Sequence, residues 1–222
     1  MSIPITLIID DPAPLINVYW WHAAEMQKTE SPTVASGEPV ARTIPVDFLR
    51  RFADVISHRV IKGKFSVLPY PAGLGAITDG WPGCDERELN AWLDVARQSI
   101  TPLMDITPEI LTHAKTLDLD SLTLLPENER VWSRHQTAAT ITPYISYALE
   151  ILNAVDLEAT GVTSPWDFGI DVEAEYQLAI RDAMRQVNDR TQIWYFLHQE
   201  NEKTDFHSRV VYRRENDWQV SL

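Results

Sequence analysis

The sequence predicts an α/β fold in a single domain, built on a parallel sheet or barrel. Short runs rich in β-branched residues alternate along the chain with segments of helical periodicity, which is the pattern of repeated strand–helix units. The first run, residues 5–9, is apolar on both faces and stops at a charged pair, as buried parallel strands do. A length of 222 residues with 45% hydrophobic side chains suits one domain with a substantial core.

The expected elements follow one another in regular order. Strands are expected at residues 5–9, 62–68, 107–113, 161–166 and 192–197. Helices are expected at residues 45–60, 85–99, 137–155 and 172–187, with long loops at 11–43 and 69–83. Two strands at 210–212 and 218–220 are expected to form a hairpin. We expect one catalytic domain over residues 1–222, and its apolar last strand leaves open whether the chain is truncated at Leu222.

The first two helices have clear sequence signals at their N-termini. Proline suits the first helical position, and the first helix continues with apolar residues at helical spacing: Pro45, then Phe48, Phe52, Val55 and Ile56. In the second helix Asp85 is a suitable N-cap, and Glu88 three residues later completes a capping-box pattern.

Charge and cysteine content exclude several classes of function. The chain has 32 acidic and 19 basic side chains, a net charge of −13, which argues against binding nucleic acid. No apolar run is long enough to span a membrane, and the N-terminus lacks the pattern of a signal peptide, so we expect a cytoplasmic protein without a membrane partner. The single cysteine, Cys84, excludes an internal disulfide and a thiolate zinc cluster. The oligomeric state is left open.

Reactive side chains follow several of the expected strands, where α/β folds gather their functional groups. Asp10 and Asp11 end the first strand, and adjacent residues there point in opposite directions. One carboxylate can then bind a metal while the other serves as a base. The alternative is a turn or a helix N-cap, which aspartate also favours.

A histidine ends the expected third strand. A neutral imidazole at His113 can bind zinc or a similar metal, and Asp118 in the following loop can complete the coordination. His22 in the first long loop is an alternative for the same role. The opposing interpretation is a hydrogen-bonded histidine that only stabilises the strand end.

Aromatic residues accompany these polar groups. Pro165 restricts the residue before it, so that the fourth strand ends in a stiff corner presenting Trp166 and Asp167. Tryptophan faces suit the apolar faces of sugar rings, and a carboxylate suits their hydroxyl groups. Trp20 and Trp21 in the first loop extend this pattern, which favours a carbohydrate ligand over aromatic rings that merely pack under a helix.

The order of these motifs resembles the polysaccharide deacetylase (NodB-homology) superfamily, related to the barrel glycosidases. Residues 7–12, Leu-Ile-Ile-Asp-Asp-Pro, are similar to its opening strand with paired aspartates, and residues 62–67 to its second strand. His113 falls at the start of its metal-binding histidine motif, whose second histidine position is Leu117 here. Residues 164–169, Ser-Pro-Trp-Asp-Phe-Gly, look like its Pro-aromatic-Gly motif.

This resemblance implies a distorted seven-stranded (β/α) barrel of the deacetylase or glycoside hydrolase type, complete or incomplete at its C-terminal end. It also implies a divalent metal, usually zinc, that activates water to remove an acetyl group from a sugar. By position Asp10 is the implied base, Asp11 and His113 are the implied metal ligands, and Pro165 and Trp166 line the substrate groove.

Metal-dependent deacetylation of an acetylated sugar or polysaccharide is therefore the leading hypothesis. One alternative is a metal-free glycoside hydrolase that pairs Asp10 or Asp11 with Asp167. Another is a barrel without catalytic activity that binds a glycan or a partner protein.

Overall fold

The computed structural model describes residues 6–17, 41–197 and 208–222. The α-helices of this described part are α1 (Val46–Arg59), α2 (Glu86–Val95), α3 (Glu129–Ser133), α4 (Ala138–Ala154) and α5 (Glu173–Asn188). The strands are β1 (Leu7–Ile9), β2 (Leu15–Asn17), β3 (Ala41–Thr43), β4 (Gly63–Val67), β5 (Met104–Pro108), β6 (Lys115–Asp118), β7 (Thr123–Asn128), β8 (Gly161–Ser164), β9 (Gln192–Leu197), β10 (Arg209–Arg214) and β11 (Asp217–Ser221). The four helices expected from periodicity are confirmed as α1, α2, α4 and α5, and α2 continues into a π-helical turn, Ala96–Ile100. None of the described helices is long and apolar enough to cross a membrane.

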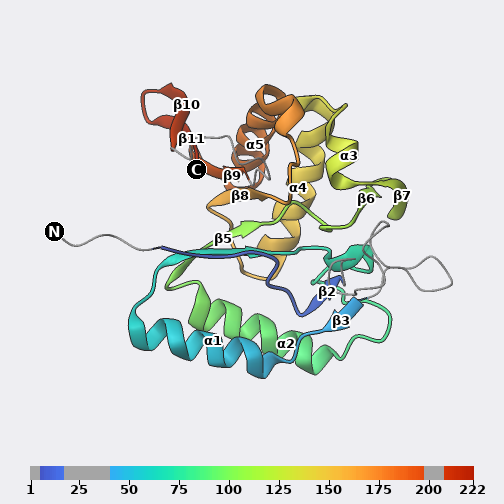
Figure 1. The fold of residues 1–222 in the computed structure, drawn as a ribbon, viewed down its shortest axis with the longest axis vertical. Helices are drawn as coiled ribbons and strands as arrows, with labels where there is room; N and C mark the ends of the chain where they lie inside the picture. Colours follow the sequence, from blue (N-terminus) through green and yellow to red (C-terminus); the bar gives the residue numbers. More distant parts are fainter. Residues whose placement is uncertain (1–5, 18–40, 198–207) are drawn as a thin grey trace.

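The first sheet contains three parallel strands in the order β1–β4–β5, and α1 and α2 run together along one side of it (Figure 1). Gly63 allows β1 to approach β4, because a Cβ at this position would lie 1.8 Å from the carbonyl oxygen of Leu7. Phe65 packs against Trp92 of α2, with ring centroids 6.3 Å apart. Because side chains alternate along a strand, Lys64 and Ser66 point to the opposite face of the sheet.

The second sheet has the order β10–β11–β9–β8. Strands β8, β9 and β11 are parallel, whereas β10 and β11 form the antiparallel hairpin expected at the end of the sequence. Helices α4 and α5 pack on each other beside this sheet (Figure 1). Tyr176 of α5 lies edge-on to Tyr195 of β9 and is fully buried, so this helix pair supplies a large part of the core.

The two sheets meet at a narrow seam between β5 and β8. An isolated parallel bridge joins Glu109 to Thr163. Backbone hydrogen bonds run from Ile110 N to Thr163 O at 3.1 Å and from Thr160 N to Ile106 O at 2.9 Å. The seam thereby brings the segments that follow β5 and β8 next to each other.

The expected seven-stranded (β/α) barrel is wrong. The described strands form separate sheets of three, four, two and two strands, and none of these sheets is closed. A barrel requires every strand to pair on both sides. In the described part of the chain, β1 and β10 each have one neighbour, and four further strands form two short antiparallel ribbons, β2–β3 and β6–β7.

The expected strand at 107–113 is also wrong in its extent. Strand β5 starts earlier, at Met104, and ends at Pro108. Ile110 and His113 have φ values of 46° and 48°, which a strand does not allow. His113 therefore lies in a loop beyond β5.

Candidate metal centre

The carboxylates of Asp10 and Asp11, directly after β1, face different partners. Asp10 Oδ1 lies 2.5 Å from Lys64 Nζ, whereas Asp11 Oδ1 lies 2.6 Å from His113 Nδ1. The backbone turns sharply between them, because Asp11 adopts a φ of 58° in the left-handed region. The adjacent carboxylates therefore have different environments, one beside an ammonium group and the other beside an imidazole.

Three side chains from two distant parts of the sequence converge beyond the ends of β1 and β5. Asp11, Glu109 and His113 each offer one ligand atom, and these atoms all lie within 4.8 Å of one another. Glu109 and His113 are buried, and Asp11 is half-buried. Two carboxylate oxygens and one imidazole nitrogen suit zinc and other divalent first-row metals. This triad can hold a metal ion.

Glu109 has an electrostatic environment that favours a cation. Burial raises the pKa of its carboxyl group well above the usual range, and the neighbouring charges of Asp11 and Asp10 raise that pKa further. The charge of Lys64 lowers the pKa of Glu109, as does the N–H of Asp11, which donates to Oε2 at 3.0 Å. A divalent cation among these carboxylates would stabilise their ionised forms in the same direction as Lys64 does.

A second buried glutamate holds the loop that carries Glu109 and His113. Glu129, the first residue of α3, accepts hydrogen bonds from Thr112 N at 2.8 Å and from His113 N at 2.9 Å. Tyr144 of α4 donates its hydroxyl proton to the same carboxylate at 2.8 Å. Burial raises the pKa of Glu129, and the hydrogen bonds from Thr112 and Tyr144 oppose that rise. Glu129 thus fixes the backbone of His113.

Four of the ten non-glycine residues with positive φ in the described part of the chain lie in or beside the triad. Asp11, Ile110, His113 and Trp166 have φ values of 58°, 46°, 48° and 45°. Residues with a Cβ rarely adopt such angles, and a β-branched residue such as Ile110 is especially disfavoured there. Strained conformations that the surrounding fold maintains are typical of functional sites.

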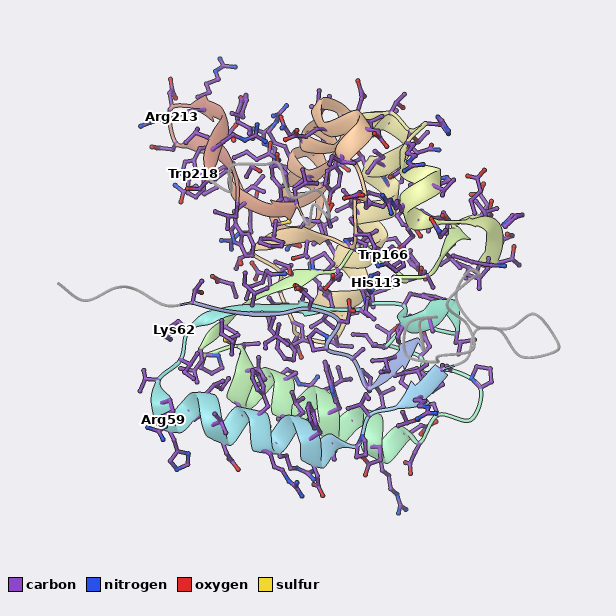
Figure 2. All side chains as sticks on the ribbon, in the orientation of Figure 1. Arg59, Lys62, His113, Trp166, Arg213 and Trp218 are labelled. Atoms are coloured by element: carbon purple, nitrogen blue, oxygen red, sulfur yellow. The ribbon has the colours of Figure 1, made fainter. Side chains whose placement is uncertain are left out.

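The segment after β8 lies directly beside the triad. The ring of Trp166 packs on that of His113, with centroids 4.2 Å apart and planes inclined at 44° (Figure 2). Trp166 is half-buried, and Pro165 before it is buried. Asp167 is buried and forms an ion pair with Arg130 of α3. An aromatic ring therefore borders the possible metal position.

A buried polar network lies on the other side, around Asp10. Lys64 Nζ donates to Asp10 Oδ1 at 2.5 Å, to Ser66 Oγ at 2.6 Å and to Thr163 Oγ1 at 3.1 Å. These three bonds use the three protons of the ammonium group. Thr163 Oγ1 is in turn 2.8 Å from Thr107 Oγ1, so the network connects β4, β5 and β8.

The structure brings together four of the predicted site residues, Asp10, Asp11, His113 and Trp166. Pro165 and Asp167 flank Trp166 in the chain. Asp118, the predicted further ligand, lies at the end of β6 and outside the group of three ligands. Its Oδ1 accepts hydrogen bonds from the backbone N–H and the hydroxyl of Ser121, both at 2.8 Å, and these bonds lower the pKa of Asp118. Trp20, Trp21 and His22 lie outside the described residues.

Four residues of the site were not predicted: Lys64, Glu109, Glu129 and Arg130. Glu109 has a recognisable signal, since it is an acid next to the apolar pair Ile110 and Leu111 in a segment expected to be buried. Lys64 is a buried cation in a strand whose other residues are uncharged. Nothing in the sequence around Glu129 distinguishes it from a solvated acid at the start of a helix.

A concave surface in the described part of the chain lies over α4 and α5, lined by Ser146, Glu150, Asn153, Gln186 and Val187. It contains a single ionisable side chain and no group of potential metal ligands. The triad, with its buried charges and strained backbone, is the stronger candidate for a functional site.

Comparison with known proteins gives no relative. No family model matches the chain, and no curated protein or solved structure matches it. The similarity to polysaccharide deacetylases therefore rests on the short sequence motifs alone.

Proposed function

We propose that this protein is a metal-dependent hydrolase that removes acetyl groups from a carbohydrate, with zinc as the first candidate metal. The observation that carries the proposal is the convergence of Asp11, Glu109 and His113 within 4.8 Å. The motif resemblance to polysaccharide deacetylases supports the same reaction, independently of the barrel that the structure excludes.

The charges around the triad fit a divalent cation. Asp10, Asp11 and Glu109 contribute three negative charges when ionised, and Lys64 offsets one of them. With a neutral imidazole at His113 the cluster keeps two negative charges. Buried charges are stable only when they are compensated, and a divalent ion compensates this pair.

Each residue has a definite role in such a reaction. A bound metal supplies Lewis acidity, polarising the acyl oxygen and lowering the pKa of its water. Asp10 is the base that takes the proton of the attacking water, because its carboxylate is outside the ligand group and its side chain is 36% exposed. Glu129 keeps His113 in position through its backbone N–H.

The surroundings of the triad favour a carbohydrate as the substrate. Trp166 presents a half-buried ring next to His113, and tryptophan faces pack well on sugar rings. Arg130, whose side chain is 33% exposed and pairs with Asp167 next to Trp166 in the chain, offers hydrogen-bond donors for hydroxyl groups.

Elemental analysis of the purified protein tests the metal site. We expect near-stoichiometric zinc, or another divalent metal, and its loss in Asp11→Ala, Glu109→Gln and His113→Ala. Asp118→Asn is the matched control, since it neutralises a nearby acid outside the ligand group and should leave the metal content unchanged. If the metal content falls in Asp118→Asn instead, Asp118 is a metal ligand, as the sequence predicts.

Activity is then measured as acetate released from a panel of acetylated mono- and oligosaccharides. We expect turnover that requires the metal and falls at least about a hundredfold in Asp10→Asn. No metal in the wild type after zinc is supplied would refute the proposal and favour a metal-free glycosidase or a binding protein.

A further inference from the structure

The buried ammonium group of Lys64 lies beside a cluster of carboxylates that can bind a cation. We propose that Lys64 is a positioning residue that reserves Asp10 for the reaction, by holding its carboxylate away from the metal bound by Asp11, Glu109 and His113. This inference rests on the proposed metal site and assigns Lys64 a function within it.

The geometry fixes Lys64 firmly on Asp10. In the pairing of β1 with β4, Ile8 is opposite Lys64, so Asp10, two residues later, comes to the same face as Lys64 and Ser66. The Lys64 side chain is 7% exposed, and its ammonium group donates three hydrogen bonds. The ring of Phe196 also lies 4.6 Å from Nζ. An ammonium group with these contacts cannot swing away without leaving buried partners unsatisfied.

A buried lysine is costly for a cation site, because the two positive charges repel each other. The charge of Lys64 is felt within the triad, where it stabilises the ionised form of Glu109. A charged Lys64 therefore lowers the affinity of the triad for a metal ion. The ion pair with Lys64 keeps Asp10 from coordinating the metal. Without Lys64, Asp10 would be a further carboxylate next to the metal and available as an additional ligand.

A purely structural role for Lys64 predicts the opposite behaviour. If the network only anchored β1 to β4 and β8, its loss would loosen the end of β1 together with Asp11. Metal would then bind more weakly. The sign of the change in metal affinity therefore separates a positioning role from a structural one.

The test is metal binding to Lys64→Met, which keeps the length of the side chain and removes its charge. Zinc affinity is measured by competition with a chromophoric chelator, and coordination by the visible spectrum of the Co²⁺-substituted protein. We expect the dissociation constant for zinc to fall about tenfold, and the Co²⁺ spectrum to show an additional oxygen ligand. Deacetylation should decrease although the metal binds more tightly.

Two further variants control the interpretation. Lys62→Met removes the same charge from an exposed lysine at the start of the same segment, and should leave zinc affinity unchanged. The double variant Lys64→Met/Asp10→Asn should lose the tenfold gain, because no carboxylate is then released. If Lys64→Met does not fold, the Co²⁺ spectrum of Asp10→Asn tests the proposal instead. A spectrum unchanged from the wild type supports the proposal, and loss of an oxygen ligand overturns it.

The outcomes also separate this inference from the proposed function. A wild-type protein that binds no metal refutes the proposed function. A wild-type protein that binds zinc, with weaker or equal binding in Lys64→Met, overturns the role of Lys64 alone.

Discussion

Two buried glutamates, Glu109 and Glu129, lie on either side of the loop that carries His113, yet their surroundings differ completely. Both are fully enclosed, and burial raises the pKa of both carboxyl groups. Glu129 receives hydrogen bonds from two backbone N–H groups and the Tyr144 hydroxyl. Glu109 receives one from Asp11 N and faces the carboxylates of Asp10 and Asp11.

The difference shows how to interpret a buried acid. Where donors surround the carboxylate, the fold has already compensated its charge, and the residue stabilises local structure. Where like charges surround it, the carboxyl group is neutralised either by a proton, as its raised pKa indicates, or by a bound cation. Burial by itself does not distinguish a structural acid from a candidate metal ligand, whereas the donors and charges around the carboxylate do.

The largest effect is expected from removing the compensated glutamate. Glu129→Ala leaves the N–H groups of Thr112 and His113 and the hydroxyl of Tyr144 without their acceptor, and should lower the free energy of unfolding by about 4 kcal/mol. At roughly 2–4 °C per kcal/mol for a domain of this size, the melting temperature falls by about 8–16 °C. Denaturant titration and calorimetry measure both; a loss below about 1 kcal/mol would mean that the loop is held by something else.

The second effect concerns metal-linked stability. Zinc at a hundred times its dissociation constant should stabilise the wild-type protein by about 2.7 kcal/mol. Glu109→Gln should abolish this gain, because an amide cannot replace a carboxylate ligand. Thermal unfolding with zinc and with a chelator gives the result, and an undiminished zinc response in Glu109→Gln would remove Glu109 from the site.

The third effect is a pH dependence in the absence of metal. The pKa of Glu109 is higher in the folded than in the unfolded protein, so its proton stabilises the fold at low pH, and this contribution is lost as pH rises from about 4.5 through the folded-state pKa. In the presence of a chelator, Glu109→Gln should therefore flatten the decline in stability above pH 4.5 and be more stable than the wild type at pH 7. Equal slopes for the variant and the wild type would contradict the environment assigned to Glu109.

The smallest effect is expected from removing one hydrogen-bond donor to Glu129. Tyr144→Phe removes one of its donors, together with the acceptor of Leu117 N, and should cost about 1 kcal/mol. Metal content should stay unchanged, since the backbone N–H of His113 keeps its bond to Glu129. Loss of metal from this variant would show that the support of the loop depends on Tyr144 more than on the carboxylate.

Local signals in the sequence predict the helices well and the arrangement of the strands poorly. Asp85 caps α2 as predicted, accepting hydrogen bonds from Arg87 N and Glu88 N, whereas the Glu88 carboxylate accepts from Val46 N of α1 instead of completing a capping box. The hairpin of β10 and β11 is equally local. Closure of a barrel depends instead on pairing between strands far apart in the sequence, and the alternation of strands and helices fits open sheets as well as a closed barrel.

The candidate site likewise has one part that local sequence signals predict and another part that depends on contacts between residues far apart in the sequence. The divergence of Asp10 and Asp11 follows from their adjacency at the end of β1, and was predictable. Glu109 was missed because its position depends on a strand that ends at Pro108 and on a loop shaped by Glu129, a residue that belongs to another element. A periodicity argument cannot detect such a contact.

The separation of the ligands along the chain has a consequence for the order of events during folding. Asp11 and Glu109 are 98 residues apart, and Lys64 is 99 residues from Thr163. Closing segments of this length costs chain entropy that only the completed sheets repay. An unfolded chain therefore offers no ready chelate of all three candidate ligands, and a metal held by this triad would bind only after the chain has acquired its shape.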